Sequence, residues 1–144
     1  MKKLKKILLV DDDQVNNYLN QKLLQGFKIA EEIKVLTNGK LAFDYILENC
    51  AETNESCPNL IILDHHMPVM DGMELMEALH SNGIITRMDV VFLLLAIQTK
   101  PEEQEVFRKL GVQEFTSKPL SKKRVFEAYE KYWAGDTVKD HTKE

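Results

Sequence analysis

The chain has 144 residues, of which 44% are hydrophobic and 29% are charged, and its formal net charge at pH 7 is −4. These values are typical of one soluble globular domain, and the negative charge disfavours nucleic acid as the main partner. The longest apolar run, residues 90–97, is far shorter than the roughly 20 residues that a membrane-spanning helix needs.

The two cysteines, Cys50 and Cys57, are too few for a disulfide framework and do not form a CxxC pair. They are close enough in sequence to bond, but free thiols in a reducing cytoplasm are the expected state. The apolar run at residues 7–10 is too short for the core of a signal peptide. We therefore expect a cytoplasmic protein without a membrane partner. The initial Met1 and the polar C-terminal end indicate a complete chain.

The first strand is predicted at residues 7–10, where a short apolar run is stopped by polar residues. Asp11, Asp12 or Asp13 can then cap a helix that ends near Gly26. The apolar positions at helical spacing in this helix are Val15, Leu19, Leu23 and Leu24.

Two further strands are predicted at residues 32–36 and 60–63. The second of these is apolar on both faces, as in the covered strands of a parallel sheet. Between them, Asn38-Gly39 marks a turn that opens a helix, and residues 51–58 form a polar loop.

The next helix opens at Asp71-Gly72, and residues 90–97 predict the fourth strand. Pro101, followed by two acidic residues, is a suitable first turn for another helix, which stops at Gly111.

A short fifth strand is predicted at residues 112–116, and Ser121 caps a last helix that continues through Trp133. Residues 134–144 form a polar tail that we expect to be disordered, so the domain would span residues 5–133. Five strand–helix pairs in alternation predict an α/β fold with a doubly wound parallel sheet.

Charged side chains follow several of the predicted strands. Asp11 and Asp12 come after the first strand, Asp64 after the third, and the fifth leads to Lys118. Ligands and reacting groups gather at the carboxyl ends of the strands in such sheets. Three carboxylates would repel one another without a cation, and Mg²⁺ is suitable because it keeps waters and can share a phosphate oxygen. The set predicts phosphoryl transfer, with Asp64 as the nucleophile that forms an aspartyl phosphate.

Four stretches carry a specific resemblance to a known family. They are ILLVDDD at residues 7–13, LDHHMPVMDG at residues 63–72, Gly111, and SKPL at residues 117–120. With these, the chain resembles a CheY-like response-regulator receiver domain of bacterial two-component signalling. The resemblance implies a flavodoxin-like (βα)5 fold, with a five-stranded parallel sheet in the strand order 2-1-3-4-5.

The resemblance also implies roles for individual residues. By position, Asp64 resembles the phosphoacceptor and Asp12 the direct magnesium ligand, with Asp11 beside it acting largely through water. The backbone carbonyl of His66 takes the third protein-ligand position. Lys118 resembles the lysine that pairs with the phosphoryl group.

Two further expectations concern the end of the domain. In the family, the peptide bond of Lys118-Pro119 is typically cis. Phe115 falls where the family has its switching aromatic residue. The expected protein-contact face combines the fourth helix, fifth strand and fifth helix, and includes Phe115, Arg124 and Phe126.

The sequence departs from the family at Ala96, where the fourth strand usually ends in threonine or serine. That hydroxyl bonds the phosphoryl group and couples it to the aromatic residue. Thr99 is the nearest hydroxyl downstream and could replace it only if residues 98–100 folded back. Phosphorylation could therefore drive a different rearrangement, serve a phosphate buffer or relay, or be lost in a pseudo-receiver that binds its partner constitutively.

The dipeptide His65-His66 after Asp64 also suggests a histidine metal site. Its partners would be His80, late in a helix, and His141, in the tail, and both are poorly placed. An Asp-His-His signature also occurs in a family of two-metal phosphoesterases, but the further acidic motifs of that larger enzyme are absent. His66 could instead tune the phosphoryl lifetime.

We therefore predict a stand-alone response regulator that takes a phosphoryl group from a sensor histidine kinase or a histidine phosphotransfer protein, with Mg²⁺ as cofactor. It would act as a switch rather than a metabolic enzyme, contacting a downstream protein target without a DNA-binding domain. The alternatives are a phosphorylation-independent interaction module, suggested by Ala96, and a small metal-dependent phosphatase that uses the same carboxylates. The sequence leaves the oligomeric state open.

Overall fold

The computed structural model describes residues 2–52 and 56–134 and contains one five-stranded sheet in the order β2-β1-β3-β4-β5. The strands are β1 (Leu4–Val10), β2 (Ala30–Leu36), β3 (Leu60–Asp64), β4 (Val91–Ala96) and β5 (Glu114–Ser117). Every pairing between neighbouring strands is parallel. The predicted α/β class and strand order are confirmed.

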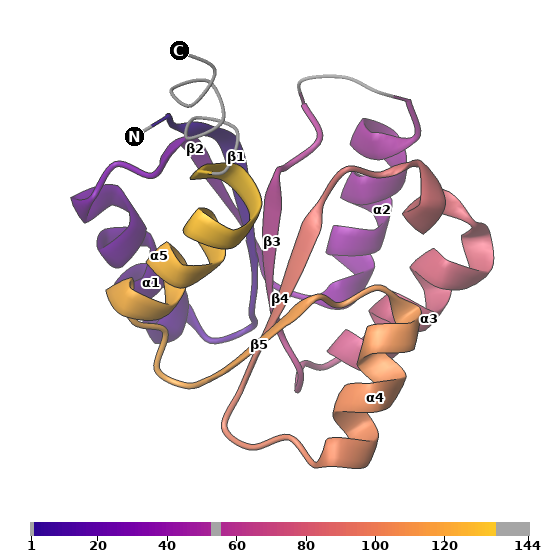
Figure 1. Ribbon diagram of the computed structural model, residues 1–144. Coiled ribbons are helices and arrows are strands. Elements are labelled where there is room, and N and C mark those ends of the chain that lie inside the picture. The colour runs from indigo at the N-terminus through magenta and orange to yellow at the C-terminus, as the bar shows by residue number, and fades with distance from the viewer. Residues whose placement is uncertain (1, 53–55, 135–144) are drawn as a thin grey trace.

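Helices cover both faces of this sheet. They are α1 (Gln14–Gly26), α2 (Gly39–Cys50), α3 (Gly72–Asn82), α4 (Pro101–Leu110) and α5 (Lys122–Tyr129), with a 3-10 turn η1 (Ile84–Arg87) and a π-helical turn η2 (Glu130–Ala134). Figure 1 shows α1 and α5 on one face, and α2, α3 and α4 on the other. Within the described ranges, no helix has the length and apolar character needed to cross a membrane.

Helix starts are set by the side chains that the sequence predicts. Asp13, Asn38, Asp71 and Ser121 each accept a hydrogen bond from a backbone N–H in the first turn of the helix that follows. Such caps satisfy donors that have no partner within the helix. They also fix where the chain turns away from the carboxyl edge of the sheet.

The apolar strands divide their side chains between two cores. Leu8 packs into the core beneath α2, α3 and α4, whereas its neighbour Leu9 packs into the core beneath α1 and α5. Each fully buried leucine contributes about 1.5–3 kcal/mol. This burial fixes the register, in which Val10 pairs with Leu63, and so brings the residues after β1 and β3 to the same edge.

The apolar spacing that predicts α1 describes its buried face only in part, since Leu24 is fully buried. Val15 and Leu19 are 65% and 56% exposed, whereas Asn17 and Asn20 are buried. The physical reason is local, because the Asn17 side-chain amide donates to the backbone carbonyl of Asp11 at 2.8 Å. Polar residues are thus buried where α1 packs behind the acidic edge, and Val15 and Leu19 face outward.

The last helix is shorter than predicted. It ends at Tyr129, and the chain continues as the π-helical turn η2, which contains Trp133. Buried Ala134 still packs against the core beneath α1 and α5, one residue beyond the predicted domain end. The rest of the predicted tail, residues 135–144, lies outside the described residues.

The expectation of free thiols is wrong. Cys50, the last residue of α2, and Cys57, in the segment before β3, form a disulfide with their Cα atoms 4.8 Å apart. The end of α2 and the residues just before β3 lie at the same end of the sheet, so these cysteines meet at the distance that a disulfide requires.

Candidate functional site

Three carboxylates meet at the carboxyl edge of the sheet. Asp11 and Asp12 follow β1, and Asp64 ends β3, its neighbour in the sheet. One oxygen from each lies within 4.8 Å of the others. Asp11 and Asp64 are buried, whereas Asp12 is exposed. The cluster is therefore open to solvent on one side, and the parallel strand order brings together the residues that the sequence predicts.

Lys118 brings a positive charge to this edge. Its Nζ lies 2.8 Å from Asp64 Oδ1, and its backbone N–H donates to the Ala96 carbonyl at 3.0 Å. The Lys118-Pro119 peptide bond is cis, as predicted. Burial alone would lower the pKa of Lys118, but the hydrogen bond and charge of Asp64 outweigh it and raise the pKa above its usual value. The lysine therefore stays charged at neutral pH.

The environment of Asp11 suits a hard cation. Its Oδ1 accepts a hydrogen bond from the Asp13 backbone at 2.9 Å, whereas its Oδ2 is buried and has no hydrogen-bond partner among the described residues. Burial raises the pKa of Asp11, and the charge of Asp64 adds to this against the opposing Asp13 bond. A divalent ion would relieve both penalties, and three carboxylate oxygens are donors that Mg²⁺ accepts.

The loop between β3 and α3 is held by close backbone contacts. The N–H of Gly72 donates to the His65 carbonyl at 2.8 Å, and the N–H of Gly39 donates to the Met70 carbonyl at 3.1 Å. A Cβ on Gly72 would lie 2.9 Å from the Asp64 carbonyl, so only glycine allows this approach. The sequence indicates a turn at both glycines but does not reveal that both clamp this loop.

His66 lies in the same loop. Its backbone carbonyl accepts no backbone hydrogen bond from the described residues outside the regular helices and strands. The His65 ring is buried, stacks on the His66 ring at 4.2 Å and meets Phe107 edge-on at 5.1 Å. Burial lowers the pKa of His65, and the neighbouring His66 adds to this.

A histidine metal centre finds no support in the described part of the chain. The residues that could hold a metal there are the three carboxylates, without a histidine. His80 is exposed near the end of α3, and His141 lies outside the described residues. His65 is therefore part of the packed interior.

Ala96 ends β4 at the edge, as the sequence predicts, and is buried. A pocket of about 150 Å³ is lined by Ala96, Thr99 and Phe115, among others. Phe115 is half-buried, with its ring 6.4 Å from the Phe107 ring and beneath the Arg108 guanidinium at 4.9 Å. The pocket thus lies between the end of β4 and the end of β5.

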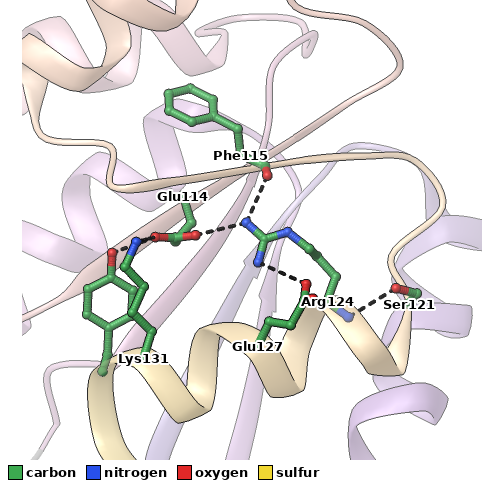
Figure 2. Close-up of polar contacts among 7 residues, drawn as sticks. Glu114, Phe115, Ser121, Arg124, Glu127 and Lys131 are labelled. Carbon is green, nitrogen blue, oxygen red and sulfur yellow. Dashed lines mark hydrogen bonds and ion pairs between the residues drawn. The ribbon is translucent and has the colours of Figure 1, made fainter.

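A buried carboxylate joins β5 to the C-terminal helical segment (Figure 2). Glu114 accepts hydrogen bonds from Arg124 and Lys131 at 2.8 Å and from the Tyr132 hydroxyl at 2.6 Å. Burial works to raise the pKa of Glu114, but the bonds from Lys131, Tyr132 and Arg124 together lower it to about 2. Arg124 also donates to the Phe115 carbonyl at 3.0 Å. No motif in the sequence signals this network.

A groove of about 670 Å³ opens on the α1 side of Lys118. Its lining includes the apolar side chains Leu19, Leu23 and Ile97. Tyr18 on α1 is also exposed. Apolar surface on α1 thus lies beside Lys118, which pairs with Asp64.

Comparison with known proteins agrees with this geometry. The family model of the response regulator receiver domain matches residues 7–130. Two-component response regulator 24 of Arabidopsis thaliana is 33% identical over 114 residues, covering 79% of this chain and 73% of that protein. Response regulator Rcp1 of Synechocystis sp. is 30% identical over 134 residues, covering 90% and 88%.

A solved structure is similar over almost its whole length. The two-component response regulator from Cytophaga hutchinsonii superposes with a TM-score of 0.78 at 28% identity, covering 91% of this chain and 98% of that one. The acidic edge, the clamped loop and the lysine before a cis proline thus occur in a chain with the fold and sequence of this family. The chain belongs to the response regulator receiver domain family.

Proposed function

We propose that the protein is a stand-alone response regulator that accepts a phosphoryl group on Asp64. The observation that carries this proposal is the ion pair between Lys118 and Asp64, formed inside a cluster of three carboxylates. Phosphoryl transfer requires positioning and charge neutralisation, and this set offers both. The donor would be a sensor histidine kinase or a histidine phosphotransfer protein, and we place the reaction in the cytoplasm.

In the proposed step, a carboxylate oxygen of Asp64 forms a bond to phosphorus while the bond from phosphorus to the donor imidazole nitrogen breaks. The imidazole leaves with the bonding electron pair. Lys118 holds a phosphoryl oxygen as it accumulates charge. Asp11, Asp12, Asp64 and the His66 carbonyl would hold Mg²⁺. The bound ion would neutralise charge on the phosphoryl oxygens.

The donor protein would dock on the exposed face of α1. Val15, Tyr18 and Leu19 are all more than half exposed and lie on the helix that borders the groove beside Lys118. Exposed apolar patches mark protein interaction sites. A donor helix on this patch would bring its phosphohistidine to the open side of the cluster.

The structural response to phosphorylation would pass through a series of aromatic ring contacts that begins next to Asp64. His65 follows the acceptor directly, its ring contacts Phe107 of α4, and Phe107 contacts Phe115 of β5. Phosphorylation changes the local charge by nearly two units and can bias a packed element with two arrangements. Because this route does not use a hydroxyl at position 96, it would function with Ala96.

The α4–β5–α5 contact face needs one adjustment. Arg124 donates to the Phe115 backbone carbonyl, and the Phe115 ring points away from Arg124 (Figure 2). Phe126 instead stacks on Phe27 with ring centroids 4.9 Å apart, beside the end of α1. We therefore propose Arg108, Phe115 and Arg124 as the centre of the surface that contacts the downstream target.

The test is intact-protein mass spectrometry after incubation with a small acyl phosphate and Mg²⁺. The protein should gain the mass of one phosphoryl group, and Asp64→Asn should gain none. Labelling that survives in Asp64→Asn would refute the assignment of the acceptor. Continuous turnover of a phosphate ester would favour a phosphatase instead.

The second candidate is a phosphorylation-independent interaction module, which Ala96 alone favours. It predicts no labelling of the parent protein, whereas Ala96→Thr would restore labelling. It also predicts equal partner affinity with and without a phosphoryl mimic. A parent protein that labels and changes its affinity excludes this candidate.

A further inference from the structure

The Cys50–Cys57 disulfide lies at the end of the sheet opposite the carboxyl edge. Cys50 is almost fully buried at 2% exposure, whereas Cys57 is half-buried. Both line a pocket of about 190 Å³ that also includes Arg87 and Asp89. Cys57 is therefore the partly accessible half of the disulfide in the folded domain.

The two elements that the disulfide joins both reach the acceptor loop at their far ends. From Cys57 the chain enters β3, which ends at Asp64. From Cys50, α2 runs back to Gly39, whose N–H holds the Met70 carbonyl at 3.1 Å.

Covalent bonds and one hydrogen bond thus link Asp64 to itself in a closed ring of contacts. The ring runs from Asp64 through β3 to the disulfide, then along α2 to Gly39. The hydrogen bond from Gly39 to Met70 leads into the acceptor loop, which returns to Asp64. No Cβ fits at Gly39 because it would overlap the Met70 carbonyl, so α2 and the loop are in close backbone contact at this point. The disulfide is the covalent link in this ring that can be opened and closed reversibly.

We propose that Cys50 and Cys57 form a reversible redox modification site that regulates phosphoryl transfer at Asp64. This regulation rests on the proposed function. Disulfides in cytosolic proteins are usually transient and redox-sensing rather than structural. The oxidised form fixes α2 against β3 and holds the loop for reaction, and the reduced form releases that constraint.

The chemistry is thiol–disulfide exchange with a cellular dithiol. A thiolate of the reductant attacks the more accessible Cys57 sulfur, forms a mixed disulfide and expels Cys50 as a thiolate, which takes a proton from solvent. The second thiol of the reductant then attacks its own sulfur in the mixed disulfide and releases Cys57. Two electrons pass to the protein, which gains two thiols, and the reductant becomes a disulfide.

The first experiment reduces the protein without denaturant, removes the reductant, and then counts thiols by intact mass after alkylation in denaturant. The air-equilibrated protein should take up no alkyl group, and the protein treated with dithiothreitol should take up two. Far-ultraviolet circular dichroism should be unchanged by the reductant. Free thiols in the air-equilibrated protein, or reduction only in denaturant, would overturn the proposal.

The second experiment measures the initial rate of Asp64 labelling by a small acyl phosphate with Mg²⁺. Reduction should slow labelling by about fivefold, at the lower end of typical coupling between two sites. The Cys50→Ser/Cys57→Ser variant should label at the reduced rate and ignore dithiothreitol. Reduced parent protein gives the same comparison if that variant does not fold.

The outcomes separate the two proposals. Equal labelling rates in the oxidised and reduced protein would overturn the redox regulation alone. Absence of labelling in both states would overturn the proposed function and this regulation with it. A rate change by dithiothreitol that persists in the double variant would show an effect that does not pass through these cysteines, and would also overturn the proposal.

Discussion

Asn17 shows how one buried side chain supports the acidic site without belonging to it. Its amide nitrogen donates to the Asp11 backbone carbonyl at 2.8 Å, and its Oδ1 is buried without a hydrogen-bond partner among the described residues. The bond fixes the chain where it leaves β1, and so the direction in which the Asp11 and Asp12 side chains leave the backbone. Residues that orient metal ligands in this way strongly affect metal affinity.

Replacing Asn17 with alanine should therefore weaken Mg²⁺ binding by about tenfold, the lower end for the loss of an orienting partner. It should also lower the free energy of unfolding by about 1–3 kcal/mol, because the Asp11 carbonyl loses its donor. Isothermal titration calorimetry measures the affinity. The matched control is Asn16→Ala, one position earlier on α1 and only partly buried. Equal affinities in both variants and the parent would contradict this role.

At the scale of elements, α1 differs from the C-terminal helical segment, α5 and η2, in the kind of side chains that it presents. The exposed side of α1 carries apolar side chains beside the groove, whereas α5 and η2 are fastened to β5 by charged and hydroxyl groups around Glu114. An element that must bind a partner keeps apolar area exposed. An element next to the proposed contact face is fixed by directional bonds.

Substitution of Leu19 by aspartate should reduce phosphoryl transfer from a phosphorylated histidine phosphotransfer protein by about tenfold, because it places a charge in the centre of an apolar contact. Labelling by a small acyl phosphate should not change, because Leu19 does not contact Asp64. Val106→Asp on α4 is the matched control, since Val106 is also exposed and apolar. If Leu19→Asp slows labelling equally with the phosphotransfer protein and with the acyl phosphate, the substitution has damaged the site. If it slows labelling with neither donor, α1 is excluded as the docking face.

Glu114→Gln should lower the free energy of unfolding at pH 7 by about 2 kcal/mol, because hydrogen bonds to a charged acceptor are lost. The pKa of Glu114 falls from 4.5 to about 2 on folding, so the folded protein binds fewer protons at this group. The Glu114 carboxylate therefore contributes fully to the free energy of unfolding above its ordinary pKa, and this contribution is lost as the pH falls toward 2.

Denaturant unfolding across this range provides the measurement. The difference in stability between the parent and Glu114→Gln should be constant above about pH 5 and should shrink below it. Glu127→Gln is the control, because Glu127 is exposed and its carboxylate lies 3.8 Å from the Arg124 guanidinium, at the long end for an ion pair. This substitution should lower the free energy of unfolding by less than about 1 kcal/mol. A difference that does not change with pH would contradict the depressed pKa.

At the scale of the whole molecule, repulsion at the acidic edge opposes the stability that the two cores provide. Burial raises the pKa of Asp11, so this group binds protons more readily in the folded protein. Its contribution favours folding at acid pH and is lost as the pH rises through the raised pKa. The charged edge is thus a local cost at neutral pH, which a bound cation would offset.

Mg²⁺ should therefore stabilise the protein, by about 2.7 kcal/mol at a free concentration one hundred times its Kd. The effect should be largest near neutral pH and should diminish in acid, where protons compete for Asp11. Thermal unfolding with and without Mg²⁺ measures it, and Asp12→Asn should reduce the shift. A Tm that ignores Mg²⁺ in the parent protein would contradict the metal site.

Much of the fold follows from the sequence because its signals are local. The apolar runs predict the buried strands, a helix opens at Asp71-Gly72 as expected, and Ser121 caps the helix that it is expected to cap. The carboxyl ends of parallel strands share one edge, so alternation of strands and helices is enough to bring Asp11 and Asp64 together. The sequence thus determined the class of fold, the acidic edge and the lysine opposite it.

Features that depend on contacts distant in sequence were decided only by the tertiary structure. Burial of Asn17 depends on the Asp11 carbonyl behind α1, and the low pKa of Glu114 depends on donors from α5 and η2. The bond between Cys50 and Cys57 depends on where α2 ends relative to β3. A sequence pattern records which side chains are apolar and how they are spaced. Partners for buried polar groups and thiols are fixed only when the elements pack.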